Sequence, residues 1–253
     1  MSRPVVCSIG TTEGWNAAGL GLDLLALWEC GARPVSIVAG VSAQDESGIR
    51  ALFPLPPEAI AAQFAALSGA QIAAFRIGAL LDPAGVAAVV AGVTKGRAPI
   101  VYDPVLAASA GGNFADAATL AMIRSELLPK SQVLTPNAGE AALLLGGAKI
   151  AARSDLAGAA QALRALGARA VLITGGDLPG SPVDVLADAD GLVEFEEERI
   201  PGDMRGTGCL LAAALAAGLA RGVALRTAVR EARAFVRRKL SAAERLGPFR
   251  VAY

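Results

Sequence analysis

The chain has 253 residues, with 23 Lys and Arg against 23 Asp and Glu, and it contains no histidine. The balanced charge gives no basic footprint for nucleic acid. Although 54% of the residues are hydrophobic, no uninterrupted apolar stretch is long enough to span a bilayer. The N-terminal residues form a strand-like run without a signal-peptide core, so a cytoplasmic location is expected.

The absence of histidine excludes Ser-His and Cys-His nucleophile pairs and His-based zinc sites. Cys7, Cys30 and Cys209 form no Cys-x-x-Cys motif, and an odd count gives no disulfide framework. Any chemistry must therefore use carboxylates, a thiol, lysine or arginine, backbone amides and a hard metal.

Short β-rich apolar runs alternate with longer segments of helical period, a pattern typical of a parallel sheet with helical crossovers. The predicted strands are Val5–Ile9, Pro34–Ala39, Ala70–Phe75, Ala98–Tyr102, Gln132–Leu134 and Ala170–Thr174. The predicted helices are Ala18–Cys30, Pro57–Leu67, Pro83–Thr94, Ala117–Leu127, Gly139–Leu145, Asp155–Leu166, Thr207–Arg221 and Leu225–Ser241.

Two further strands, near Val183–Ala187 and Gly191–Glu197, are joined by Asp188-Ala189-Asp190 and predict an antiparallel hairpin. The chain shows no linker, low-complexity tract or internal repeat. Residues 1–253 are therefore expected to form one α/β domain, with a mostly parallel central sheet, helices on both faces and this late hairpin.

Two segments follow predicted strands at the sheet edge where α/β proteins bind ligands. In Tyr102-Asp103-Pro104-Val105 a strand runs into an acidic residue, although Asp before Pro also starts turns. In Thr135-Pro136-Asn137-Ala138-Gly139-Glu140, Asn137 and Glu140 share one face of a helix start. Their amide and carboxylate oxygens suit Mg²⁺, but the same spacing also predicts a capping arrangement.

The strongest local signal is Arg205-Gly206-Thr207-Gly208-Cys209, which runs into an apolar helix. Glycines at a helix start let backbone N–H groups approach an anion, although the motif taken alone is usually a tight turn with a threonine cap. Cys209 alone could be a buried, inert residue. Its place in the first turn indicates instead a thiol whose pKa the helix N-terminus lowers, ready to act as a base.

Together these segments resemble the ribokinase superfamily, and specifically its hydroxymethylpyrimidine/phosphomethylpyrimidine kinases. Ala18–Leu24 resembles the family's Ala-Gly-Ile-Gln-Ala-Asp-Leu, Val41–Gly48 its Ala-Gln-Asn-Thr-x-Gly, and Arg76–Leu80 its Lys-Ile-Gly-Met-Leu. The Asp-Pro-Val, Thr-Pro-Asn-x-x-Glu and Gly-Thr-Gly-Cys segments follow in the expected order. The resemblance covers nearly the whole chain and implies a ribokinase-like fold.

The resemblance implies a role for each matched residue. Gly206, Thr207 and Gly208 would form an anion hole for the transferring phosphoryl group, and Cys209 would be the base toward the substrate hydroxyl. Asn137 and Glu140 would hold Mg²⁺ with Asp103 nearby. Gln44 would hydrogen-bond the aminopyrimidine edge, and Gly10 and Asp23 would flank the same pocket.

The chain also departs from the family pattern. The Gly-rich opening becomes Gly10-Thr11-Thr12-Glu13-Gly14-Trp15-Asn16-Ala17, two family lysines correspond to Ser109 and Thr174, and the histidine before Gly-Thr-Gly-Cys is Arg205. Because the chain has fewer lysines near the phosphates, the activity that these replacements affect most is the phosphorylation of an already phosphorylated substrate. Arg205 could replace some of the lost charge, because guanidinium suits phosphate.

The expected function is ATP- and Mg²⁺-dependent phosphorylation of 4-amino-5-hydroxymethyl-2-methylpyrimidine, of its monophosphate, or of both, in thiamine biosynthesis. Two alternatives stay open: a pyridoxal-type kinase of the same superfamily, and a catalytically weak relative that binds a pyrimidine. The expected partners are small molecules, with no nucleic acid and no membrane. The resemblance further implies a homodimer.

Overall fold

The computed structural model describes residues 2–107 and 111–252. Its strands are β1 (Val5–Thr12), β2 (Arg33–Asp45), β3 (Gly48–Pro54), β4 (Ile72–Ile77), β5 (Ile100–Tyr102), β6 (Val133–Leu134), β7 (Val171–Ile173), β8 (Val183–Asp188), β9 (Gly191–Glu196), β10 (Glu244–Leu246) and β11 (Phe249–Val251). Its α-helices are α1 (Gly19–Glu29), α2 (Pro57–Ala66), α3 (Pro83–Val93), α4 (Ala117–Met122), α5 (Ala138–Leu144), α6 (Arg153–Ala165), α7 (Thr207–Ala220) and α8 (Leu225–Ser241).

Within the described residues, nine strands form one sheet in the order β3-β2-β1-β4-β5-β6-β7-β8-β9. The six strands from β2 to β7 in this order run parallel, while β3, β8 and β9 pair antiparallel. The predicted mostly parallel sheet with a late antiparallel hairpin is confirmed, because β8 and β9 pair along their length from Val183 with Glu196 to Asp188 with Gly191.

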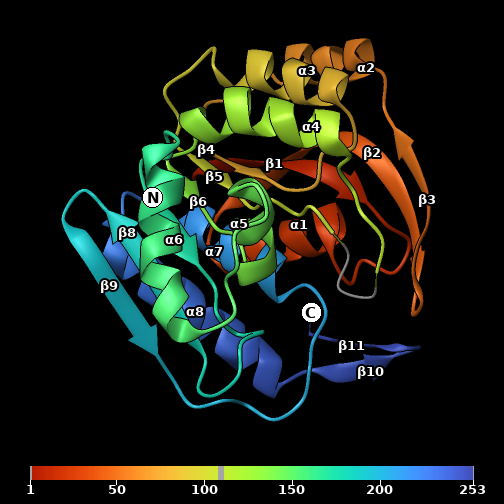
Figure 1. The fold of residues 1–253 in the computed structure, drawn as a ribbon. Helices are drawn as coiled ribbons and strands as arrows, with labels where there is room; N and C mark the ends of the chain where they lie inside the picture. The colour runs from red at the N-terminus through yellow and green to blue at the C-terminus, as the bar shows by residue number, and fades with distance from the viewer. Residues whose placement is uncertain (1, 108–110, 253) are drawn as a thin grey trace.

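Helices cover both faces of the sheet, as Figure 1 shows. One core gathers strand residues such as Ile9 and Ile77 against α3, α5 and α6, and the other gathers Val6 and Val101 against α1, α7 and α8. Adjacent residues of the parallel strands therefore serve opposite cores, which explains their nearly continuous apolar sequences. Among the described residues, no helix combines the length and hydropathy needed to cross a membrane.

The structure contains two hairpins that the sequence pattern did not predict. Strand β2 continues six residues beyond the predicted end at Ala39 and turns at Asp45–Gly48 into β3. Strands β10 and β11 form a second, separate hairpin near the C-terminus. Both hairpins lack a regular alternation of polar and apolar residues over a length sufficient for prediction.

Candidate active site

A cavity of about 450 Å³ lies where the carboxyl ends of β1, β4, β5 and β6 meet the N-terminal end of α7. The lining includes the predicted residues Gln44, Asp103, Asn137, Glu140, Gly206, Thr207, Gly208 and Cys209. These residues come from four separate segments of the chain. The sequence predicted a ligand site at this edge of the parallel sheet, and the cavity lies at this edge.

Gly206 is the N-cap of α7 and has a left-handed backbone, with φ +81°. A Cβ there would lie 2.3 Å from Leu22 Cδ2 and 2.5 Å from the Ala17 carbonyl oxygen, so only glycine fits. No side chain caps this helix, and the alternative of a threonine cap is therefore wrong. The N–H groups of the first turn have no hydrogen-bond partner within the helix. Because this turn lines the cavity, the N-terminus of α7 is suited to bind an anion there.

Cys209 lies in the first turn of α7, nearly buried and part of the cavity lining. Burial raises the pKa of its thiol to about 12, although Arg76 and the Gly19 backbone N–H oppose the rise. The expectation of a lowered thiol pKa is therefore wrong. The helix N-terminus and one cation do not compensate for lost solvent and for the nearby Asp23 and Asp103 carboxylates.

Asn137 and Glu140 form a complete capping box at the start of α5. The Glu140 backbone N–H donates to Asn137 Oδ1 at 2.8 Å, and the Asn137 N–H donates to Glu140 Oε2 at 2.9 Å. The capping interpretation is confirmed. Both residues also line the cavity, so the capping box fixes the two side chains beside it.

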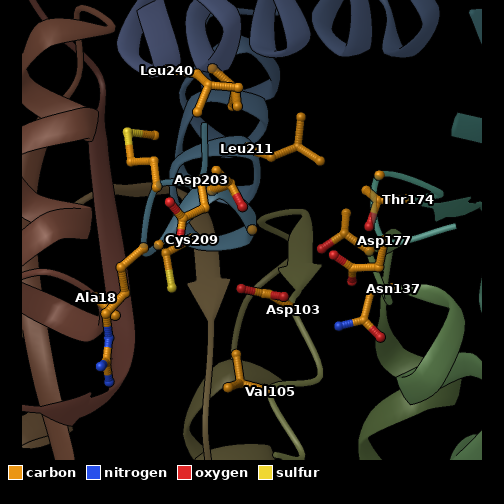
Figure 2. A pocket seen from close by; sticks show the side chains of 18 of the residues that line it. Ala18, Asp103, Val105, Asn137, Thr174, Asp177, Asp203, Cys209, Leu211 and Leu240 are labelled. Carbon is orange, nitrogen blue, oxygen red and sulfur yellow. The ribbon is translucent and has the colours of Figure 1, made fainter. Parts of the chain in front are cut away.

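Asp103 and Glu140 are buried carboxylates, and Asp103 is close enough to raise the pKa of Glu140. Burial, and then the Asp103 charge, raise the pKa of Glu140 to about 8, and burial raises the pKa of Asp103 against the opposing Arg76. Figure 2 shows Asp103 in the middle of the cavity near Cys209, with Asn137, Thr174 and Asp177 together at one side. Two buried, mutually repelling carboxylates form a location that favours a cation.

Gln44 reaches the cavity from the β2–β3 hairpin. Its Nε2 donates to Ser42 Oγ at 2.8 Å, and its Oε1 accepts a hydrogen bond from the Arg205 guanidinium. Arg205 itself stacks on the Phe249 ring, with 4.5 Å between Cζ and the ring centroid. Both ends of the Gln44 amide are thus held by the protein.

Gly10 and Asp23 do not line the cavity among the described residues. Asp23 is fully buried, where its Oδ2 accepts from Ser8 Oγ at 2.7 Å and pairs with Arg76 Nη1 at 2.9 Å. The expectation that these two residues flank the substrate pocket stays a prediction, since each contacts a lining residue, Gly10 beside Ala79 and Asp23 with Arg76. Asp23 lies beneath the cavity wall because its charge is neutralised there by the buried guanidinium.

The structure adds Arg76 and Glu13 to the cavity lining. Arg76 is 1% exposed although it lies in the apolar strand β4, and a lone charge in such a strand is the signal that the sequence offered. The Glu13 carboxylate accepts from the N–H groups of Trp15 at 2.7 Å, Ala17 at 2.6 Å and Ala18 at 3.1 Å. Glu13 therefore orders the loop that replaces the family's Gly-rich opening.

The positions of the two missing lysines differ in what the structure shows. Thr174 lines the cavity and is joined to the Asn137 segment through its N–H, which donates to the Pro136 carbonyl at 2.9 Å. Ser109 lies outside the described residues. The cavity nevertheless contains cations, since Arg199, Arg205, Arg233 and Arg237 line it.

The fold and the site together define a ribokinase-like kinase, with two glycines and a thiol at a helix start facing acidic residues. A family model described as phosphomethylpyrimidine kinase matches residues 15–252. The chain belongs to the phosphomethylpyrimidine kinase family.

Its relatives agree with this family. The chain is 36% identical to a hydroxymethylpyrimidine/phosphomethylpyrimidine kinase of Rhizobium meliloti, over 96% of this chain and 92% of that one. It is 34% identical to the protein of the same name from Streptomyces coelicolor, over 98% and 92%. A Bacillus subtilis pyridoxal kinase solved as an ADP complex superposes with a TM-score of 0.89 at 27% identity, covering 97% of this chain and 95% of that one.

Proposed function

We propose that this protein transfers the γ-phosphate of ATP to the hydroxymethyl group of 4-amino-5-hydroxymethyl-2-methylpyrimidine, and to the phosphate of its monophosphate, in thiamine biosynthesis. The observation that carries the proposal is the meeting of Gly206, Thr207, Gly208 and Cys209 with Asp103 in one cavity. Family membership and the relatives' names support the substrate class.

In this proposal the chain supplies two of the elements that phosphoryl transfer needs. The α7 N-terminus stabilises the charge that develops on the transferring group, because unpaired N–H groups face it. Cys209 takes the proton from the substrate hydroxyl as the new bond to phosphorus forms. The raised thiol pKa makes it a strong base once ionised, while only a small fraction is ionised at neutral pH.

Asp103 and Glu140 are the residues that would hold Mg²⁺. Among the described residues, no group of three His, Cys, Asp or Glu side chains is arranged to bind a metal by itself. This agrees with the usual binding of Mg²⁺ by one or two carboxylates, with phosphate oxygens and water completing the shell. When bound, Mg²⁺ would supply charge neutralisation at the phosphates.

Arg205 is the residue of this chain best placed to support the second phosphorylation. It directly precedes the anion hole, and its guanidinium is held on Gln44 and Phe249 at the cavity wall. A guanidinium there offers a phosphomonoester paired donors that the missing lysines would have supplied as point charges. This supports activity on the monophosphate as well as on the alcohol.

A pyridoxal-type kinase is the second candidate, because the Bacillus subtilis pyridoxal kinase shares the fold and 27% of the sequence. The experiment measures ATP consumption separately with the hydroxymethylpyrimidine, its monophosphate and pyridoxal, each with and without Mg²⁺. We expect Mg²⁺-dependent turnover with both pyrimidines. Turnover with pyridoxal alone selects the second candidate, and binding without turnover selects a catalytically weak relative.

Three further expectations belong to this proposal. We propose that residues 1–253 act as one domain, supported by a sheet whose strands extend from Val5 to Glu196. A homodimer and a cytoplasmic location remain predictions. Sedimentation at micromolar concentration tests the dimer, for which the expected mass is twice the 25.4 kDa of one chain.

A further inference from the structure

Arg76 is a buried guanidinium that the mechanism above does not use. Its Nη1 pairs with Asp23 Oδ2 at 2.9 Å and its Nη2 with Asp103 Oδ2 at 2.7 Å. The two carboxylates come from different elements, since Asp23 lies in α1 and Asp103 follows β5. One planar group thus joins α1, β4 and the carboxyl end of β5 directly beneath the cavity.

The Cys209 thiol lines the same cavity and lies close enough to this guanidinium for the positive charge to lower the thiol pKa against the effect of burial. Gly78 leaves the room that this arrangement needs, because a Cβ at Gly78 would lie 2.1 Å from Arg76 Nη1. The side chain is therefore confined by two ion pairs and by the backbone at Gly78. A guanidinium has a rigid, planar set of donors, so fixing two of its nitrogens also fixes the direction of the others.

An ion pair alone does not explain a buried arginine at this position. Removing a charge from water costs more than a single pair usually returns, and apolar residues often replace buried pairs without loss. Here Arg76 Nε and Asp23 Oδ1 also lack a hydrogen-bond partner within the described residues. The arrangement is costly for stability, and the feature it secures is the relative position of Cys209 and Asp103.

We propose that Arg76 is a positioning residue for phosphoryl transfer, whose guanidinium, paired with Asp23 and Asp103, holds the Asp103 carboxylate at a fixed place beside the Cys209 thiol. The distance between the Cys209 thiol and the Asp103 carboxylate then stays the same while substrates bind and leave. The inference rests on the proposed kinase function for its kinetic consequence, while the ion pairs of Arg76 with Asp23 and Asp103 stand independently. The resembling family has lysine at this position, which can supply the charge but not the planar set of donors.

The kinetic test compares Arg76→Met, which removes the donors at similar volume, with Arg76→Lys, which keeps a point charge. For Arg76→Met we expect kcat to fall about 100-fold or more with each KM changed less than about threefold. Arg76→Lys should recover at least about tenfold of that loss and stay about three- to tenfold below wild type. Arg226→Met is the control, because Arg226 pairs with Asp188 away from the cavity and should leave kcat within about twofold.

A second measurement needs no substrate. In a Cys7→Ser, Cys30→Ser background, the rate of Cys209 alkylation by iodoacetamide is measured at one alkaline pH. Loss of the neighbouring guanidinium should slow alkylation about tenfold in Arg76→Met, with a smaller change in Arg76→Lys and none in Arg226→Met.

A folded Arg76→Met with kcat within about threefold of wild type would overturn the proposal. If Arg76→Met does not fold, Arg76→Lys decides: wild-type kcat together with a wild-type alkylation rate rejects it. If the wild-type protein turns over no pyrimidine and no pyridoxal, the proposed function fails, and the alkylation rates alone decide whether the guanidinium held by Asp23 and Asp103 acts on the thiol.

Discussion

At the scale of single residues, Cys209 is the most informative side chain in the cavity. Its position at the start of α7 favours a base, whereas its burial opposes ionisation, with a thiol pKa of about 12. The two facts are compatible, because the thiolate is a strong base and accelerates proton transfer even though only a small fraction of the molecules carry it. Together they predict how kcat responds to substitution of Cys209 and to pH.

We expect Cys209→Ala to lower kcat about 10²–10⁴-fold, the usual effect of removing a positioned general base. Binding of ATP and of the pyrimidine should persist, because the anion hole and the acidic residues remain. Cys209→Asp, which mimics the wider superfamily, should recover part of the rate. The control is Cys30→Ala, since Cys30 lies at the end of α1 outside the cavity lining. Turnover of Cys209→Ala within about twofold of wild type would reduce Cys209 to a packing role.

The raised thiol pKa also predicts the pH dependence of the rate. Below about pH 12 the ionised fraction of Cys209 grows about tenfold per pH unit, because deprotonation increases with pH. We therefore expect kcat to rise between about pH 7 and pH 10 without a plateau. Steady-state rates over this range measure it, and the rise should vanish in Cys209→Ala. A plateau near neutral pH would show that bound substrates lower the thiol pKa strongly.

A substitution at Gly206 tests the proposed anion hole by adding a single carbon atom. In Gly206→Ala the new Cβ would meet Leu22 and Ala17 while the backbone keeps φ +81°. We expect a loss of about 1–3 kcal/mol of unfolding free energy together with lower turnover. Gly222→Ala is the matched control, since Gly222 has φ +80° with no atom within 4 Å of a Cβ. Equal losses in the two variants would assign the whole effect to backbone strain.

At the scale of elements, the two residues that cap the N-terminus of α5 also line the cavity. Its capping box uses the Glu140 carboxylate to hold the Asn137 N–H, and the same carboxylate is repelled by Asp103. A helix of seven residues depends on such capping. The element therefore fixes an acidic side chain at the cavity that burial alone would disfavour.

Glu140→Gln separates these two contributions. Glutamine also completes a capping box, so the melting temperature should stay near that of wild type. Turnover should fall about tenfold or more, and a higher Mg²⁺ concentration should be needed, because one charge leaves the metal site. Thermal melts and Mg²⁺ titrations of turnover measure both. A large drop in melting temperature with unchanged activity per folded molecule would leave only the capping role.

At the scale of the whole molecule, residues 161 positions apart close one side of the cavity. The β2–β3 hairpin brings Gln44 to Arg205, which precedes α7. The C-terminal hairpin brings Phe249 under Arg205, and Trp15 packs edge-on against Phe249 with 5.7 Å between the ring centroids. The position of Gln44 at the cavity therefore depends on three distant segments.

Gln44→Leu tests this convergence. A buried ring nitrogen and amine of the pyrimidine would lose their partner, which should weaken pyrimidine binding by about 1–3 kcal/mol. The KM for ATP should be spared. Gln161→Leu is the control, because Gln161 is exposed on α6. Wild-type pyrimidine affinity in Gln44→Leu would remove Gln44 from the binding site.

The sequence by itself determined the parallel sheet, the late hairpin and the segments that form the cavity. Apolar runs of fixed period report burial directly, and parallel strands bring the residues after their carboxyl ends to one edge. Asp103, Asn137, Glu140 and Gly206–Cys209 could be assigned to the cavity for this reason. The β2–β3 and β10–β11 hairpins could not be predicted, because short irregular strands are selected by contacts with distant segments.

Only the tertiary structure decided the electrostatics of the cavity. Sequence position places Cys209 at a helix start, where its thiol pKa should fall, but burial beside Asp23 and Asp103 raises it. Sequence order likewise places Asp23 near the pocket, but its partner is Arg76, 53 residues further along the chain. Desolvation and ion pairing depend on which distant residues share a buried volume, and the order of residues along the chain does not specify that volume.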